Sequence, residues 1–112
     1  MVTVALTGRL TRDPQLREVA LPGSGPTFVC EARLAARDSR GRRVFLDCSQ
    51  WGPGGRAAAE HLQKGSLVAF SGELRFDESE GEAGRRQHYS AVGRIEFLGA
   101  GASEALGEAP GA

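Results

Sequence analysis

Hydrophobic and polar residues alternate along most of the chain, which is the pattern of β-strands that bury one face. In the first strand, for example, Val2, Val4 and Leu6 lie on one side, and Gly8 suggests a bulge or a sharp bend further along. A short extended piece follows at residues 15–19. The alternation predicts five main strands, at residues 2–10, 27–37, 43–51, 66–76 and 87–97.

Glycine and proline mark the connections between these strands. Residues 22–26 read PGSGP and predict a loop. Residues 38–42 predict a hairpin turn in which Gly41 takes a positive φ. Residues 77–86 are acidic and contain glycine, so we expect a mobile loop there.

The segment between the third and fourth strands is different. GPGG at residues 52–55 breaks the sheet, and the alanine-rich residues 56–63 predict a short helix. Gly65 ends this helix, with Lys64 in its last turn, where a cation suits the helix dipole. Three strands, a helix and two strands make an all-β chain, and the arrangement is that of the five-stranded Greek-key barrel called the OB-fold.

The length of 112 residues is enough for one domain. We expect residues 1–98 to form the OB-fold domain, with Phe28, Phe70 and Phe97 in its core. Residues 99–112 are rich in glycine and alanine and contain a single leucine, which predicts a disordered tail.

Composition narrows the class of protein further. No apolar run approaches the ~18 residues of a membrane span, and the N-terminus lacks the pattern of a signal peptide. Cys30 and Cys48 have no metal-ligand spacing and predict free thiols in a reducing cytoplasm. The net charge is zero, but residues 1–56 carry +4 and residues 57–112 carry −4, and Lys64 is the only lysine.

No catalytic motif is present, so we expect no enzyme activity, no metal and no cofactor. The two histidines, His61 and His88, belong to no metal motif. Asp47 and Glu73 could form a carboxylate pair across strands, as a metal-dependent nuclease needs. The simpler interpretation is a local salt bridge for Asp47 and a solvated Glu73.

Two large aromatic residues lie on the polar side of the third strand. Phe45 and Trp51 share that side with Asp47 and Ser49, and they are six residues apart, or about 20 Å. Aromatic rings in this position can stack bases of a single strand, at about 1–3 kcal/mol per base. Alternatively, Trp51 caps the barrel and Phe45 packs beneath a loop.

Basic residues surround this strand and could track phosphates, or could simply keep the surface soluble. They are Arg33, Arg37, Arg40, Arg42, Arg43 and Arg75. Phe76 and Tyr89 could add further stacking, or could be rim packing.

Three parts of the chain together resemble the bacterial single-stranded-DNA-binding protein family. Residues 2–17 read VTVALTGRLTRDPQLR, close to the family's opening strand followed by G-R-L-x-x-D-P-E-L-R. Residues 45–52 read FLDCSQWG, close to F-I-D-x-x-x-W-G. Residues 61–68 read HLQKGSLV, close to Y-L-x-K-G-S-x-V, and GELR follows at residues 72–75.

The resemblance implies an OB-fold that binds single-stranded DNA without sequence preference in replication, recombination or repair, hence at the nucleoid. It implies a homotetramer of dimers that pair through the first strand, at Val2, Val4 and Leu6, although a dimer is also possible. Phe45 and Trp51 match the family's stacking aromatics. The basic residues that match its DNA path are Lys64, Arg75 and one of Arg42 and Arg43.

The chain also departs from the family pattern. The family often has an aromatic residue in the hairpin after the second strand, where this chain has residues 39–41 without one. It has a further aromatic residue in the hairpin between the last two strands, where this chain has residues 77–79, with Phe76 nearby as a substitute. The sequence ends EAPGA, without the acidic, aromatic-ended tip, so we expect no tip-mediated recruitment of replication enzymes. Two alternatives therefore stay open. One is a tail-less accessory paralogue such as a primosome component, and the other is an OB-fold module that binds protein.

Overall fold

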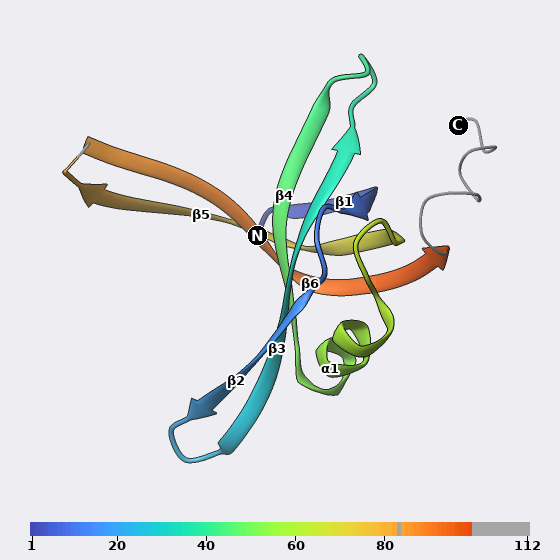
Figure 1. Cartoon of the computed structure of the whole chain (residues 1–112). Helices are drawn as coiled ribbons and strands as arrows, with labels where there is room; N and C mark the ends of the chain where they lie inside the picture. Colours follow the sequence, from blue (N-terminus) through green and yellow to red (C-terminus); the bar gives the residue numbers. More distant parts are fainter. Residues whose placement is uncertain (83, 100–112) are drawn as a thin grey trace.

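The computed structural model describes residues 1–82 and 84–99, which form six strands and one helix (Figure 1). The five expected strands are all present, and the short extended piece expected at residues 15–19 belongs to a sixth strand, residues 15–21. In chain order the elements are β1 (Thr3–Leu10), β2 (Gln15–Leu21), β3 (Gly25–Arg37), β4 (Arg43–Trp51), α1 (Gly52–His61), β5 (Leu67–Gly81) and β6 (Gly84–Gly99).

Five of the strands pair in a closed ring. β1 pairs with β5, β5 with β6, β6 with β4, β4 with β3, and β3 returns to β1. The β4–β6 contact is parallel and the others are antiparallel. The additional strand β2 extends the sheet at the edge of β3. The helix lies between β4 and β5 in the chain, so the predicted OB-fold, with its helix between the third and fourth barrel strands, is confirmed.

Gly8 allows β1 to approach β3 where the ring closes. A Cβ atom at Gly8 would lie 2.5 Å from the carbonyl oxygen of Ala35, so no larger residue fits without a backbone shift. The β1–β5 register passes through Gly8 without interruption, and the predicted bulge is therefore wrong. Beyond Gly8, Arg9 and Leu10 pair with Ala35 and Leu34 of β3.

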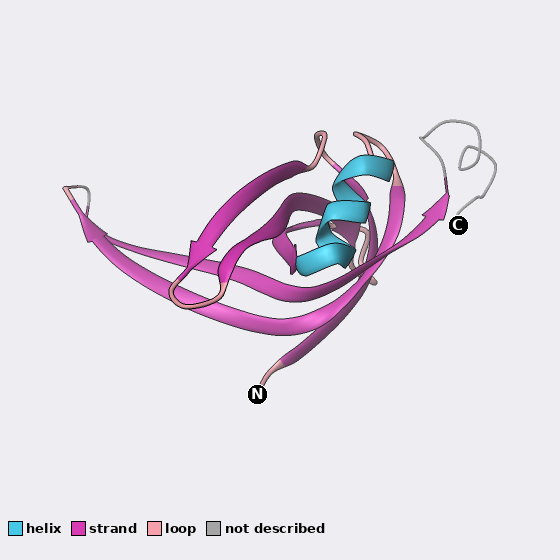
Figure 2. Cartoon of the chain, turned by 90° about the horizontal axis from the view of Figure 1, so that it is seen from below, coloured by secondary structure: helices cyan, strands magenta, loops and turns pink. Residues whose placement is uncertain are grey.

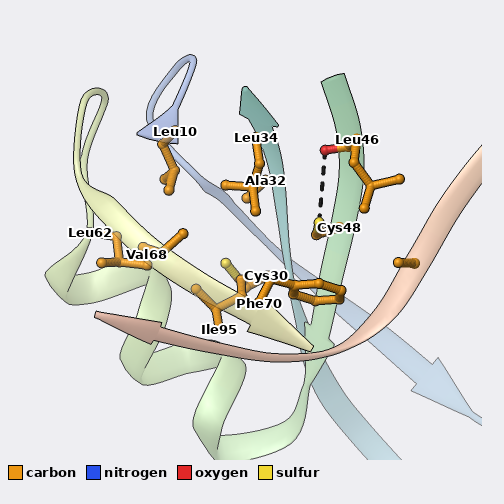
Figure 3. Close-up of a cluster of buried hydrophobic side chains, with 11 residues drawn as sticks. Leu10, Cys30, Ala32, Leu34, Leu46, Cys48, Leu62, Val68, Phe70 and Ile95 are labelled. Atoms are coloured by element: carbon orange, nitrogen blue, oxygen red, sulfur yellow. Dashed lines mark hydrogen bonds between the residues drawn. The ribbon is translucent and has the colours of Figure 1, made fainter. Parts of the chain in front are cut away.

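The core fills the ring (Figure 3). Phe70, Leu34 and Val68 are completely buried, and Cys30 and Cys48 are free and buried among them. Phe28 is half-buried at the edge, with the Arg56 guanidinium 4.9 Å from its ring centre. The other members of the buried cluster are Leu10, Ala32, Leu46, Leu62, Ala91 and Ile95.

The prediction of a core position for Phe97 is wrong. Phe97 is 56% exposed, although Ile95 on the same side of β6 is buried. Phe97 lies nearer the end of β6, where it borders a hollow between α1 and β6 that Leu62 and Ile95 also line. The end of β6 therefore extends beyond the core.

The expected mobile loop at residues 77–86 is also wrong. β5 continues to Gly81 and β6 starts at Gly84, so these residues form a β-hairpin arm that extends from the barrel (Figure 1). Across the arm, Asp77 faces His88 and Glu80 faces Arg85. Opposite charges on directly facing residues favour a strand pair, and the Glu80–Arg85 register is of this kind.

The helix begins and ends earlier than the sequence predicted. It spans Gly52–His61, with proline in its first turn, where the missing N–H costs nothing. Lys64 therefore lies in the turn after the helix and not in its last turn. α1 packs against β3, β4 and β6, and Figure 2 shows the helix lying against the strands. Within residues 1–82 and 84–99, no helix has the length and apolar character to span a membrane.

The predicted tail falls mostly outside the described residues. Gly99, its first residue, is the last residue of β6. Residues 100–112 are not among those that the structure describes, so the expectation for them stays a prediction.

Candidate nucleic-acid interface

The outer side of β4 presents two accessible aromatic rings. Phe45 is 44% exposed and Trp51 is 43% exposed, whereas Leu46 and Cys48, on the inner side of the same strand, are buried. The alternation along β4 thus places both rings on the outside of the barrel. Neither ring has the burial expected if Trp51 capped the barrel or Phe45 packed beneath a loop. We call this surface, with the neighbouring outer residues of β3 and β6, the β4 face.

A charged network occupies the middle of the β4 face. The Arg33 guanidinium donates from Nη1 to Oδ1 of Asp47 at 3.0 Å, and Nε2 of His88 lies 3.1 Å from the other carboxylate oxygen. Arg33 also stacks on Phe45, with 5.2 Å between its Cζ atom and the ring centre. Arg33 is thus held between a carboxylate and a ring that is available to a base.

The carboxylates of Asp47 and Glu73 both lie beside basic side chains. The two oxygens of Asp47 face Arg33 and His88, and Glu73 lies 3.6 Å from Arg75. In the part of the chain that the structure describes, no group of three or more His, Cys, Asp or Glu residues could hold a metal ion. The simpler interpretation of Asp47, a local salt bridge, is confirmed.

At the Trp51 end of the face, β2 adds an ion pair. The register aligns Arg17 with Val29, and Val29 with Trp51, so Arg17 lies two strands from the indole. Nη2 of Arg17 donates to Glu31 at 2.9 Å. That hydrogen bond and the charge of Glu31 raise the pKa of Arg17, which keeps the pair ionic. The positive charge near Trp51 is therefore balanced by a neighbouring carboxylate.

At the Phe45 end, a groove of about 710 Å³ opens between β1, β3, β4 and the turn before β5. Three predicted basic residues, Arg37, Arg43 and Lys64, line it together with Phe45. A fourth cation, Arg9, also lines it and is not among the predicted site residues. Its position within residues 2–17, which carry part of the family resemblance, is the feature of the sequence that could have identified Arg9 as a site residue. We call this feature the cationic groove.

The β3–β4 turn carries the remaining predicted arginines of this end. The Asp38 carboxylate accepts hydrogen bonds from the backbone N–H groups of Arg40 (2.8 Å) and Arg42 (2.9 Å), and Gly41 has the predicted positive φ of 80°. Arg37 donates to the carbonyl of Gly41 at 2.8 Å. The side chains of Arg40 and Arg42 are exposed at this turn.

Phe76 and Tyr89 form a separate aromatic pair. Their ring centres are 4.8 Å apart, and both residues are exposed on the β5–β6 arm. They follow the side of the two strands that carries Leu74 and Ala91, which is the core side. Arg75, by contrast, follows the outer side. The structure therefore does not bring Phe76 and Tyr89 onto the β4 face.

The predicted self-association strand differs in part from expectation. Val4 and Leu6 are half-buried and pack against the core, whereas Val2 is 59% exposed. β1 pairs along its length with β5, but meets β3 only at Arg9 and Leu10. Within the described residues, the backbone of the earlier part of β1 thus has one edge without a partner strand.

This geometry is that of an oligonucleotide-binding OB-fold barrel. OB-fold barrels bind oligonucleotides on the face of the two strands that correspond here to β3 and β4. Exposed aromatic rings flanked by cations are the usual means by which such barrels hold a single strand.

Comparison with known proteins defines the class more closely. Residues 1–98 match the Single-strand binding protein family. A single-stranded DNA-binding protein of Clostridium tetani is 31% identical over 113 residues, which cover 96% of this chain and 77% of the relative. One of Bacillus cereus is 34% identical over 94 residues, which cover 82% of this chain and 55% of the relative. The chain belongs to the single-strand binding protein family, and it spans about half the length of the Bacillus relatives.

Proposed function

We propose that this chain binds single-stranded DNA without sequence preference, and so protects it in replication, recombination or repair. The observation that carries the proposal is the exposure of Phe45 and Trp51 on one side of β4, above a strand whose other side is buried. Each ring can stack a base, at about 1–3 kcal/mol per base, whatever the base is. The activity is binding and not catalysis, and it places the protein at the nucleoid.

The phosphates of the strand contact the cations around these rings. Lys64, Arg37 and Arg43 act from the cationic groove, and the other arginines proposed for the DNA path are Arg33, Arg40, Arg42 and Arg75. Phe76 and Tyr89 act as a second stacking platform on the arm, where a longer strand reaches them. The names of the relatives, which are single-stranded DNA-binding proteins, support the same substrate.

The binding unit associates with itself through β1. The support for this is the edge of β1 that has no partner strand among the described residues, together with the exposed Val2 at its start. Residues 1–98 are the DNA-binding domain of each subunit, and the assembly is a tetramer or a dimer.

Fluorescence of the indole tests the substrate directly. Trp51 is the only tryptophan in the chain, so its emission reports on one position of the β4 face. Addition of oligothymidylate should quench this emission, and a duplex of the same length should not. Unchanged emission at saturating single strand, or equal quenching by duplex, would contradict base stacking on this face and would favour a protein-binding module instead.

A further inference from the structure

Positive charge is distributed unevenly over the proposed DNA path. Three arginines on or beside the β4 face lie next to a carboxylate: Arg33 beside Asp47 on the face itself, Arg17 of β2 beside Glu31, and Arg75 of β5 beside Glu73. The face between Trp51 and the middle of β4 is therefore nearly neutral. A carboxylate beside a cation reduces the attraction that the cation offers to a phosphate.

Among the described residues, the cationic groove has no such ion pairs, although the Asp13 carboxylate at its edge accepts a hydrogen bond from the backbone N–H of Lys64 at 2.8 Å. None of its lining residues is acidic, and its cations, Arg9, Arg37, Arg43 and Lys64, form no ion pair with any carboxylate of residues 1–82 and 84–99. A concave site lined by charge of one sign concentrates the field and attracts a ligand of the opposite sign.

Arg9 points to an anionic ligand most directly. Its Nη1 donates to the carbonyl of Gly65, which fixes the guanidinium at the groove. Its Nη2 is shielded from solvent and has no hydrogen-bond partner among the described residues. A cationic donor left without a partner away from water carries a desolvation cost, and an anion in the groove would offset this cost through its charge.

The groove also offers a place for a base. Phe45 lines it, and the Arg43 guanidinium lies 5.9 Å from the centre of the Phe45 ring. The volume of about 710 Å³ is within the range of small-molecule sites, about 300–1,000 Å³. One ring and four cations around one hollow match the two parts of a nucleotide, a flat base and a phosphate.

We propose that the cationic groove is a nucleotide subsite that anchors single-stranded DNA, with one base on Phe45 and its backbone phosphate beside Arg9, Arg43 and Lys64. The subsite fills first, and the strand then extends along β4 towards Trp51. This inference rests on the proposed function, because the same β4 face must bind single-stranded DNA. It adds an order of occupation and assigns the salt-dependent part of binding to one end of the face.

The first test uses the separation of the two rings. Phe45 and Trp51 are six residues apart on one strand, which is about 20 Å. Labelled oligothymidylates of about 4 to about 16 nucleotides, the range of OB-fold site sizes, are titrated with protein while anisotropy reports binding and Trp51 emission reports arrival at the far ring. We expect the shortest oligomers that bind to leave Trp51 emission unchanged, and longer ones to quench it. Quenching that accompanies binding at every length would overturn the proposed order.

The second test uses the salt dependence of binding to the longer oligomers. Each phosphate contact contributes about 0.7 to the slope of log K against log salt for a single strand, so its loss weakens binding about fivefold at about 0.1 M salt. We expect this decrease in slope in Arg9→Gln and in Arg43→Gln. Arg43 is exposed, so its variant remains informative if Arg9→Gln unfolds.

Arg56→Gln is the matched control. It removes the same charge from α1, where Arg56 lies 3.6 Å from Glu60 and over the ring of Phe28, and it does not line the cationic groove. We expect an unchanged slope for this variant. Equal slopes in the Arg43 and Arg56 variants, with quenching by long oligomers retained, would refute the subsite alone. Absence of binding by wild-type protein to any single strand would instead refute the proposed function.

Discussion

Replacement of Phe45 by alanine separates a binding role from a packing role. Phe45 is 44% exposed, and its ring contacts the guanidinium of Arg33 at 5.2 Å. Phe70, a second phenylalanine in the same barrel, is 1% exposed and lies in the core. The pair Phe45→Ala and Phe70→Ala therefore makes the same chemical change in two opposite environments.

The two variants should differ in what they lose. Loss of a stacked base costs about 1–3 kcal/mol, so Phe45→Ala should weaken binding by about 5-fold to about 150-fold at about 1.4 kcal/mol per tenfold. Full burial of a large apolar side chain is worth about 1.5–3 kcal/mol, and an exposed cation–π contact about 0.5–1 kcal/mol. For a half-exposed ring, the loss of unfolding free energy should be about 1–2 kcal/mol. Phe70→Ala should lose about 3–5 kcal/mol.

Urea unfolding and anisotropy titration with a labelled oligothymidylate measure both quantities on the same preparations. The expected pattern is a large loss of affinity with a small loss of stability for Phe45→Ala, and the reverse for Phe70→Ala under conditions where it stays folded. If Phe45→Ala lost as much stability as Phe70→Ala and bound DNA with wild-type affinity, Phe45 would be a packing residue and the reasoning would be refuted.

Three further outcomes are expected. Gly8→Ala should destabilise the barrel by about 1–3 kcal/mol in urea unfolding, because the new Cβ would meet the Ala35 carbonyl oxygen at 2.5 Å; wild-type stability would show that β1 and β3 are not so close. Burial, and secondarily the charge of Asp47, raises the pKa of the Cys48 thiol to about 12. Native protein should therefore resist thiol reagents at mildly alkaline pH, and rapid labelling without denaturant would contradict the burial. The free energy of unfolding should also fall as pH rises from about 9, where the thiol of the unfolded chain ionises, towards 12. Analytical ultracentrifugation at micromolar concentration should detect self-association through β1, and a monomer would count against it.

The barrel strands were predictable because each has one buried side. In β4, Leu46 and Cys48 alternate with Phe45 and Asp47, and the structure preserves that division between inside and outside. The same alternation predicted that Phe45 and Trp51 lie outside. The alternation could not predict the β2–β3 pairing. Nearly every residue of β2 is exposed, so this strand has no buried side to produce an alternating pattern.

The remaining differences depend on contacts between distant parts of the chain. The arm at residues 77–86 is a strand pair in which residues of opposite charge, Glu80 and Arg85, face each other, although its acidic, glycine-containing sequence resembles a loop. The cationic groove combines β1, β3, β4 and the turn at Lys64, so the position of Arg9 depends on the closure of the ring. Phe97 lies on the same side of β6 as the buried Ile95, but the core does not extend as far along the strand as Phe97.

The central claim is that the open β4 face binds unpaired nucleotides. A salt titration of binding to labelled single-stranded DNA, with duplex DNA of the same sequence in parallel, tests it most directly. We predict strong preference for the single strand and a steep loss of its affinity between about 50 and about 200 mM salt. Equal affinity for the two forms, or no binding to either at low salt, would contradict the account.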